Sequence, residues 1–176
     1  LEQRAAGQVY LETGRGERKA TGSYYTPQYI VEYIVDNTLG PLVEQARQQV
    51  KARAKEAPSR AAAAEAEQSF IDEILRLKVL DPAMGSGHFL VEATEYLARA
   101  LATDPYVHPP LNPPVNEGTQ WGDTTEEDLT LWKRRVVERC IYGVDKNPLA
   151  VELAKLSLWL TTVAAERPLS FLDHHL

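Results

Sequence analysis

Apolar residues recur at helical spacing after Thr26-Pro27, where proline stands at the first position of a predicted helix. Gly40-Pro41 is expected to close or kink this helix, because proline lacks a backbone donor. A polar helix is predicted over 42–57, and the break at Pro58-Ser59 separates it from an alanine-rich helix over 59–77. Residues 1–22 are polar and contain glycines, so we expect an irregular arm there. The pattern therefore predicts an N-terminal arm followed by helices over residues 1–77.

Two short apolar strands alternate with helices in the rest of the chain. The first, Lys78–Asp81, runs into a glycine-bearing turn and a helix, and the second, Cys140–Asp145, precedes a helix that opens at Pro148. Strand, turn and helix repeated in this order are typical of a parallel, doubly wound α/β sheet. We therefore predict the first part of an α/β domain over 78–176, with an inserted proline-rich surface loop over 104–127.

Three further segments complete the predicted domain. A helix over 126–139 leads into the second strand, and the tail over 168–176 is expected to begin a third. The last helix should turn one apolar face inward, made of Ala150, Val151, Ala154, Leu158 and Leu160.

Composition narrows the classes of protein. The net charge of −6 gives no overall attraction to nucleic acid. No apolar run approaches the roughly 18 residues of a membrane span, and no signal peptide is visible. The single cysteine, Cys140, is expected to be buried and inert, which fits a reduced, cytoplasmic setting. Without a long apolar run we expect no membrane attachment. Because the chain opens on Leu1 and not on methionine, we expect it to be part of a longer protein.

The most informative segment is Asp81-Pro82-Ala83-Met84-Gly85-Ser86-Gly87-His88-Phe89-Leu90. Glycines between a strand and a helix let the backbone approach a ligand closely, and the helix N-terminus offers free amide groups there. The dinucleotide fingerprint needs a third glycine where Leu90 stands. An adenosine ligand without phosphates has no such need, so methionine joined to adenosine fits the turn better than a dinucleotide.

Asp145, at the end of the second predicted strand, is the candidate ribose ligand. A carboxylate offers two acceptor oxygens to the two ribose hydroxyls. The usual spacing after the fingerprint is about 20 residues, and the spacing here is far longer. The loop over 104–127 and the helix after it account for the excess as an insertion.

A third segment, Gly22-Ser23-Tyr24-Tyr25-Thr26-Pro27, lies upstream of the first strand. Taken alone it predicts only a helix start, with the threonine hydroxyl as a cap and the tyrosines as core residues.

Taken together, these three segments resemble the motifs of N6-adenine-specific DNA methyltransferases. Similar proteins are the modification subunits of type I systems and long restriction-modification or phage-defence polypeptides, and the resemblance covers residues 18 to about 165. It implies a Rossmann-like methyltransferase fold with S-adenosylmethionine as the cofactor. It also implies DNA as a partner, bound mostly through other regions, and contact with the remainder of a parent polypeptide or a specificity subunit.

The resemblance assigns cofactor-binding roles residue by residue. It implies that the methionine end of the cofactor is bordered by Tyr25, Thr26 and Pro27. The loop beneath the cofactor would be formed by Asp81, Pro82, Ala83, Gly85, Ser86 and Gly87. Asp145 would hold the ribose, and Lys146 and Asn147 would lie beside the adenine edge. His88 is expected to pack or face solvent, and no residue is predicted to bind a metal.

Asn112-Pro113-Pro114-Val115 matches the family's catalytic Asn-Pro-Pro-aromatic motif only superficially. It follows no apolar strand, and Val115 cannot stack on a flipped-out adenine. We expect the true motif to lie beyond Leu176, so no catalytic residue is assigned and the chain alone should not methylate.

Three alternatives remain open on the sequence. One is methylation of RNA adenine or of a protein glutamine, because such enzymes share the catalytic motif. Another is a non-catalytic module that binds cofactor or partner subunits. The third is a nicotinamide enzyme, which the missing third glycine disfavours.

Overall fold

The computed structural model describes residues 25–105, 107, 126–162 and 172–176. Its elements, in chain order, are the helices α2 (Gln28–Glu56) and α3 (Arg60–Leu75), the strand β1 (Val79–Asp81), the helices α4 (His88–Thr103) and α5 (Glu126–Cys140), the strand β2 (Ile141–Gly143) and the helix α6 (Pro148–Thr161). The chain is mostly helical, and the predicted order of strand, turn and helix is confirmed. The predicted arm over 1–22 and most of the predicted loop lie outside the described residues.

α2 is one continuous helix, so Gly40-Pro41 does not close it, and the separate polar helix predicted over 42–57 is its second part. Pro41 costs the helix one backbone hydrogen bond. Buried apolar side chains recur along one face on both sides of the proline, at Val31, Val35, Leu39, Val43, Ala46 and Val50. Their packing against α4 and α3 offsets the loss, so tertiary contacts hold the helix together across the proline.

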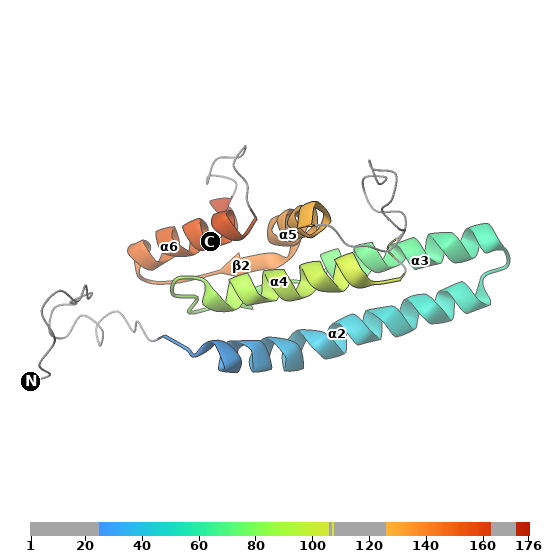
Figure 1. Cartoon of the computed structure of the whole chain (residues 1–176), viewed down its shortest axis with the longest axis horizontal. Helices are drawn as coiled ribbons and strands as arrows, with labels where there is room; N and C mark the ends of the chain where they lie inside the picture. Colours follow the sequence, from blue (N-terminus) through green and yellow to red (C-terminus); the bar gives the residue numbers. More distant parts are fainter. Residues whose placement is uncertain (1–24, 106, 108–125, 163–171) are drawn as a thin grey trace, which may run out of the picture.

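α2 and α3 form a long hairpin that extends away from the strands (Figure 1). Ser59 begins α3 as its N-cap, and its side-chain oxygen accepts a hydrogen bond from the backbone N–H of Ala62 at 3.2 Å. The predicted break before the alanine-rich helix is therefore confirmed. The N-terminal half of α2 packs instead on α4, which connects the hairpin to the rest of the molecule (Figure 1).

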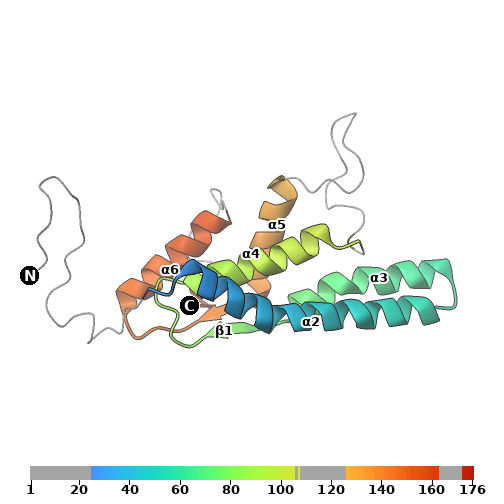
Figure 2. The same cartoon turned by 60° about the horizontal axis from the view of Figure 1, so that its bottom comes forward.

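β1 and β2 pair in parallel, with Val79 opposite Ile141 and Asp81 opposite Gly143. One face of this two-stranded sheet packs on α4 (Figure 2). On the other face Leu80 is 60% exposed, and Val144, just beyond β2, is 57% exposed. The packing against α4 places the carboxyl ends of both strands beside the start of that helix.

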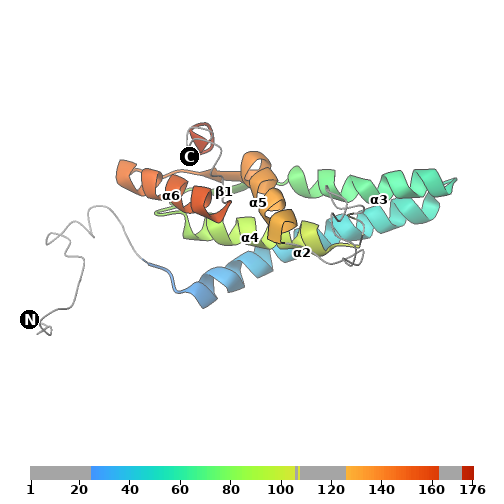
Figure 3. The same cartoon turned by 45° about the horizontal axis from the view of Figure 1, so that its top comes forward.

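α4 is the central element and contacts every other helix and both strands. Its fully buried residues include Leu90, Leu97 and Leu101, and α5 runs across it (Figure 3). Cys140, at the end of α5, is buried as predicted, and burial raises the pKa of its thiol to about 11. The core therefore surrounds α4 and includes the buried faces of α2, α5 and α6, the last turns of α3 and the sheet.

Two predictions near the C-terminus are wrong. Leu160 is 59% exposed, because the face of α6 that meets α4 is made of Ala154 and Leu158. Residues 172–176 form a helical turn and not a strand, since Leu172 accepts hydrogen bonds from the N–H groups of His175 and Leu176. The turn still lies along β2, because the Gly143 N–H donates to the His175 carbonyl at 2.9 Å.

Within the described residues, no helix is long and apolar enough to cross a bilayer. The same part of the chain contains no group of three or more histidine, cysteine or acidic residues arranged to hold a metal ion.

Candidate functional site

The glycine-bearing turn connects the end of β1 to the start of α4, and it requires glycine at two positions. Gly85 has a φ of +55° and Gly87 has a φ of +84°, in the left-handed region that residues with a Cβ atom rarely adopt. A Cβ atom on Gly87 would also lie 3.1 Å from the Cβ of Ala154 in α6. The two glycines therefore let the turn reverse sharply while its backbone touches the neighbouring helix.

Backbone hydrogen bonds fasten this turn to the end of β2. The Val144 N–H donates to the carbonyl of Asp81 at 2.9 Å, and the Met84 N–H donates to the carbonyl of Val144 at 3.0 Å. The Met84 side chain is buried beneath the turn. The parallel pairing thus continues past both strands and brings the first residues of the turn beside Asp145.

Asp145 links the second strand to the glycine turn through its carboxylate. One oxygen accepts the Gly85 N–H at 2.9 Å, and the other accepts the N–H of Asn147 at 2.8 Å. An ionised carboxylate has about four lone-pair sites, so two remain for a ligand hydroxyl. Asp145 therefore fixes the shape of the turn and keeps capacity to accept further hydrogen bonds.

Asp81, at the end of β1, has a similar local role. Its side chain accepts the backbone N–H of Ala83 at 3.0 Å, which holds the first bend of the turn. Pro82, Ala83 and Ser86 are exposed, so the outer surface of the turn is open to a ligand. The first N–H groups of α4 have no acceptor within the helix and add positive potential at the same place.

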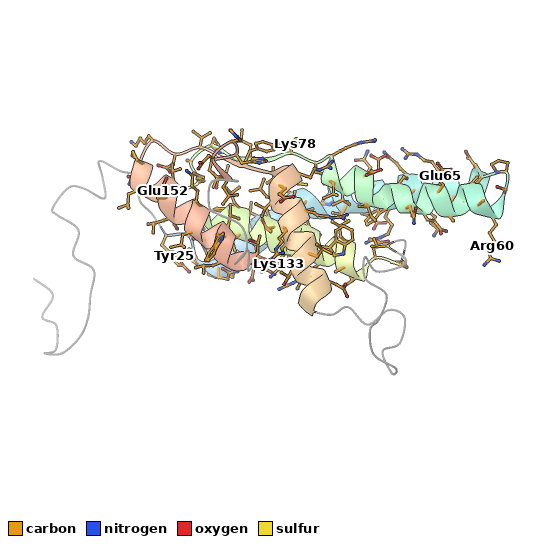
Figure 4. All side chains as sticks on the ribbon, turned by 90° about the horizontal axis from the view of Figure 1, so that it is seen from above. Tyr25, Arg60, Glu65, Lys78, Lys133 and Glu152 are labelled. Atoms are coloured by element: carbon orange, nitrogen blue, oxygen red, sulfur yellow. The ribbon has the colours of Figure 1, made fainter. Side chains whose placement is uncertain are left out.

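The segment upstream of the first strand lies beside this turn, although it is far away in sequence. The ring of Tyr25 stacks on the imidazole of His88, with the ring centroids 5.4 Å apart and the planes 18° from parallel. Figure 4 shows Tyr25 at the end of the molecule opposite Arg60 and Glu65 of the hairpin tip. The structure therefore brings Tyr25 together with the glycine turn.

Two local expectations for that segment are wrong. Tyr25 is 81% exposed and is not a core residue, because it precedes α2 and its ring stacks on His88 at the start of α4. Thr26 does not cap the helix: the N-cap residue is Pro27, and no side-chain hydrogen bond caps α2. Among the described residues, neither the Thr26 nor the Pro27 side chain has a hydrogen bond to the turn, so their predicted place beside the cofactor stays a prediction.

Sequence reasoning missed a polar network beside the turn. The Nε2 atom of His88 lies 2.5 Å from Oε1 of Gln28, and Nε2 of Gln28 donates to Glu92 at 2.8 Å and to Glu32 at 2.9 Å. His88 was expected only to pack or face solvent. The position of His88 inside the turn motif indicated that it lies near the site, but the sequence did not predict its contact with Gln28 of α2.

The other predicted positions fall outside this cluster or have structural roles. Asn147 is the N-cap of α6, and its side-chain oxygen accepts the N–H of Leu149 at 3.1 Å. Lys146 is exposed. The segment 112–115 lies outside the described residues, and the prediction that it is not catalytic stays a prediction.

An apolar pocket of about 270 Å³ adjoins the turn without including its glycines. It lies between α2, β1 and α4, and Asp81 and Pro82 form part of its lining. Because neither Gly85 nor Asp145 lines it, this pocket is a neighbour of the predicted cofactor site and not the site itself.

The arrangement is suited to binding more than to acid–base chemistry. At the carboxyl edge of a parallel sheet it combines an exposed turn, helix amides with no acceptor in their own helix and a carboxylate with spare acceptor capacity, and an aromatic ring stacks on His88 beside the turn. These groups match a ligand with hydroxyl donors at one end and a charged group at the other.

Comparison with known proteins supports this interpretation. Residues 54–171, which are more than half of the chain, match the model of the MmeI DNA-methyltransferase domain. The match includes the glycine turn and Asp145 and begins after Tyr25.

Two curated relatives cover more of the chain. A protein of Methanocaldococcus jannaschii described as a type II restriction enzyme and methyltransferase is 29% identical over 162 residues, with 83% of this chain covered. The adenine-specific methyltransferase PglX of Streptomyces coelicolor is 25% identical over 162 residues, with 92% of this chain covered. The matched region is 12% and 10% of their respective lengths. No solved structure matches the chain.

Proposed function

The chain belongs to the family of the MmeI DNA-methyltransferase domain, and from this premise we propose that it binds the cofactor of an adenine-specific DNA methyltransferase. The proposed reaction transfers a methyl group from S-adenosylmethionine to N6 of adenine, in restriction-modification or phage defence. The family supports methyl transfer to DNA, and the name of one relative, an adenine-specific methyltransferase, supports adenine as the target base. On this proposal the domain is a Rossmann-like methyltransferase fold that begins near residue 78, with an insertion over 104–127 and a helical extension over 1–77.

The single observation that carries the cofactor assignment is the hydrogen bond from the Gly85 N–H to Asp145. It brings together an acidic residue at the end of the second strand and a glycine turn at the end of the first, the two features that contact nucleotides at this edge of α/β sheets. We propose that Asp145 accepts the ribose hydroxyls through its remaining lone pairs. The methionine part would lie over the turn formed by Asp81, Pro82, Ala83, Gly85, Ser86 and Gly87.

The segment Tyr25, Thr26 and Pro27 would border the methionine end of the same cofactor. The stacking of Tyr25 on His88 supports this, because His88 follows directly after Gly87. Free amide groups at the start of α4 suit the methionine carboxylate, since a helix N-terminus favours an anion. Lys146 and Asn147 are the proposed neighbours of the adenine edge.

The cofactor supplies an activated methyl group on sulfur, so the protein needs no strong acid or base at this site. The residues of this chain bind and orient the cofactor, which lowers the entropic cost of an in-line transfer. We assign no catalytic residue and no metal. DNA contact is proposed to come mostly from other regions, with the rest of a longer polypeptide or a specificity subunit as partner, in a cytoplasmic setting without membrane attachment.

The buried position of Leu90 argues against a nicotinamide dinucleotide. Leu90 occupies the place of the third fingerprint glycine and is 1% exposed, packed on Gly143 of β2. A dinucleotide fingerprint uses glycine there for close packing of helix on strand. The DNA-methyltransferase family and the relative described as a restriction enzyme also favour DNA over RNA or protein as the methylated substrate.

Calorimetric titration with S-adenosylmethionine tests the proposal, with NAD as the control ligand. We expect binding of S-adenosylmethionine alone, and an increase in dissociation constant of about tenfold or more in Asp145→Ala, from the loss of charge-assisted hydrogen bonds. Asp72→Ala, an exposed aspartate on α3, is the matched control and should bind like the unaltered chain.

Asp145 also holds the turn, so the free energy of unfolding is measured for both variants without ligand. A loss of binding with unfolding preserved assigns Asp145 to the cofactor. Binding of NAD, or no binding of S-adenosylmethionine by the unaltered chain, contradicts the proposal.

A further inference from the structure

Four polar side chains meet where the N-terminal ends of α2 and α4 come together. The amide of Gln28 lies at the centre, between His88 and Glu92 of α4 and Glu32 of its own helix. Gln28 donates to both carboxylates through Nε2 and faces His88 with Oε1, at 2.5 Å from the imidazole Nε2. This network adds polar contacts between the two helices that carry the upstream segment and the glycine turn.

The two carboxylates determine which way the Gln28 amide points. Ionised carboxylates accept hydrogen bonds and do not donate them, so they must face the amide NH₂ group. The opposite orientation would place the amide oxygen against two further acceptors. The oxygen of Gln28 is therefore left for His88.

The amide orientation then determines the tautomer of His88. Because Oε1 of Gln28 accepts only, the imidazole Nε2 must carry the proton of their hydrogen bond. In the neutral imidazole, Nδ1 of His88 is then the lone-pair nitrogen. Nδ1 is buried without a hydrogen-bond partner among the described residues. The glutamate pair thus acts through Gln28 to orient the imidazole and to select the Nε2–H tautomer of its neutral form.

The imidazole plane is the surface on which Tyr25 lies. Tyr25 precedes α2 and is mostly exposed, so its described contact with α4 is the stack on His88. His88 in turn is the first residue of α4, directly after Gly87. A rotation of the imidazole would therefore break the stack with Tyr25, the residue directly before Thr26-Pro27.

We propose that Gln28 and His88 are positioning residues, which hold the Tyr25–Pro27 segment against the glycine turn so that the two can enclose one ligand. The inference deepens the proposed function and rests on it for the identity of that ligand, S-adenosylmethionine. Neither residue needs to touch the cofactor. Glu32 and Glu92 orient the Gln28 amide, Gln28 orients His88, and His88 carries Tyr25.

The first test compares cofactor affinity in two glutamine variants of α2. Gln28→Ala should raise the dissociation constant for S-adenosylmethionine about five- to tenfold, as expected for the loss of one or two hydrogen bonds. Gln48→Ala is the matched control, because Gln48 is exposed on the same helix and its described hydrogen bond is local, to Glu44. It should change affinity less than about twofold, the range of an exposed local contact.

His88→Phe separates the stack from the hydrogen bond, because phenylalanine keeps a ring for Tyr25 and removes both nitrogens. If Gln28 acts by orienting the ring, this variant should bind as weakly as Gln28→Ala, and the double variant should be no weaker than either. Affinity unchanged in Gln28→Ala, with the unaltered chain binding normally, would overturn the proposal.

A second measurement needs no ligand and isolates the network itself. Imidazole ¹⁵N chemical shifts of His88 should report the Nε2–H tautomer in the unaltered chain and a mixture of tautomers in Gln28→Ala. A change in general stability alone would not produce this shift in tautomer. The same tautomer in both proteins would overturn the orienting role of Gln28.

The two measurements separate failure of this inference from failure of the proposed function. No binding of S-adenosylmethionine by the unaltered chain would contradict the proposed function, and the tautomer would still decide whether Gln28 orients His88. Normal binding together with a Gln28-independent tautomer would leave the proposed function intact and remove the positioning network.

Discussion

Gly143 and Leu90 are a pair of residues whose sizes compensate for each other. A Cβ atom on Gly143 would lie 2.2 Å from Sδ of Met84 and 2.8 Å from Cδ1 of Leu90. The small residue stands on the strand and the large one on the helix, whereas a dinucleotide fingerprint places a glycine on the helix. In this chain the glycine that allows close packing of α4 on the sheet is therefore on the strand, and the large residue is on the helix.

The two glycines of the turn should differ in their tolerance of alanine. In Gly85→Ala the new Cβ has no atom within 4 Å, so the left-handed backbone is the source of strain, and a loss of about 1 kcal/mol in the free energy of unfolding is expected. Gly87→Ala pays for the same strain and also crowds Ala154, whose Cα would be 3.2 Å from the new atom, so about 2–4 kcal/mol is expected. Urea unfolding monitored by circular dichroism measures both, and equal losses would show that α6 moves aside.

At the scale of elements, α2 and α4 are joined at two places by polar contacts and between them by apolar packing. The Gln28 network lies at one end, and Arg47 lies at the other, where its Nε donates to Asp104 just after α4 at 2.8 Å. The Asp104 side chain is fully buried, while Arg47 is 37% exposed and also lies over the ring of Phe70. The pKa of Arg47 is raised, mainly by its hydrogen bond to Asp104.

Removing this arginine should cost far more than removing an exposed one from the same helix. Arg47→Ala takes a cation from a buried carboxylate, for which a loss of about 2–4 kcal/mol in the free energy of unfolding is expected. Arg53→Ala removes a more exposed pair with Glu73 and should cost below about 1 kcal/mol. Thermal and urea unfolding of both variants measure the difference. Similar small losses would mean that Asp104 does not depend on Arg47.

Element order was predictable from the sequence where local signals agreed with the final packing. A short apolar run followed by glycines and an amphipathic helix has few alternatives, so β1, α4, β2 and α6 were expected close to where they lie. Proline at position 41 gave the wrong signal, because the apolar positions that hold α2 together act through contacts with other helices. The prediction that Leu160 faces inward was wrong for a similar reason. α6 meets α4 through a narrow face, and the periodicity of apolar residues does not give the width of that face.

The candidate site was predictable only in part, for a related reason. The glycine turn and Asp145 sit on strand ends, and parallel strands bring their carboxyl ends to one edge. The hydrogen bond between Gly85 and Asp145 follows that rule. The contact of Gln28 with His88 depends on how two helices cross, and no local pattern in the sequence encodes a partner 60 residues away.

At the scale of the whole molecule, stability is expected to fall from the central helix toward the hairpin tip. Every residue over 51–69 has an exposed or half-buried side chain, and the tip extends away from the other elements (Figure 2). α4, by contrast, contacts every other described helix and both strands, and it carries fully buried leucines. Local opening costs least where few apolar side chains are buried, so the tip should open without the core.

Amide hydrogen exchange tests this gradient and its coupling to the proposed cofactor. Amides of Leu97 and Leu101 should exchange slowest, near the rate of global unfolding, and amides over 51–66 should exchange at least about tenfold faster, since a difference of 1.4 kcal/mol in opening corresponds to that factor. Saturating S-adenosylmethionine should slow exchange in α4 and at the start of α2, because binding stabilises the folded core by mass action. Exchange at the tip should keep the rate that it has without cofactor, because the tip can open while the cofactor remains bound. Equal protection of tip and core would mean that the molecule opens only as one unit, and that the hairpin is held by contacts stronger than its exposed surface implies.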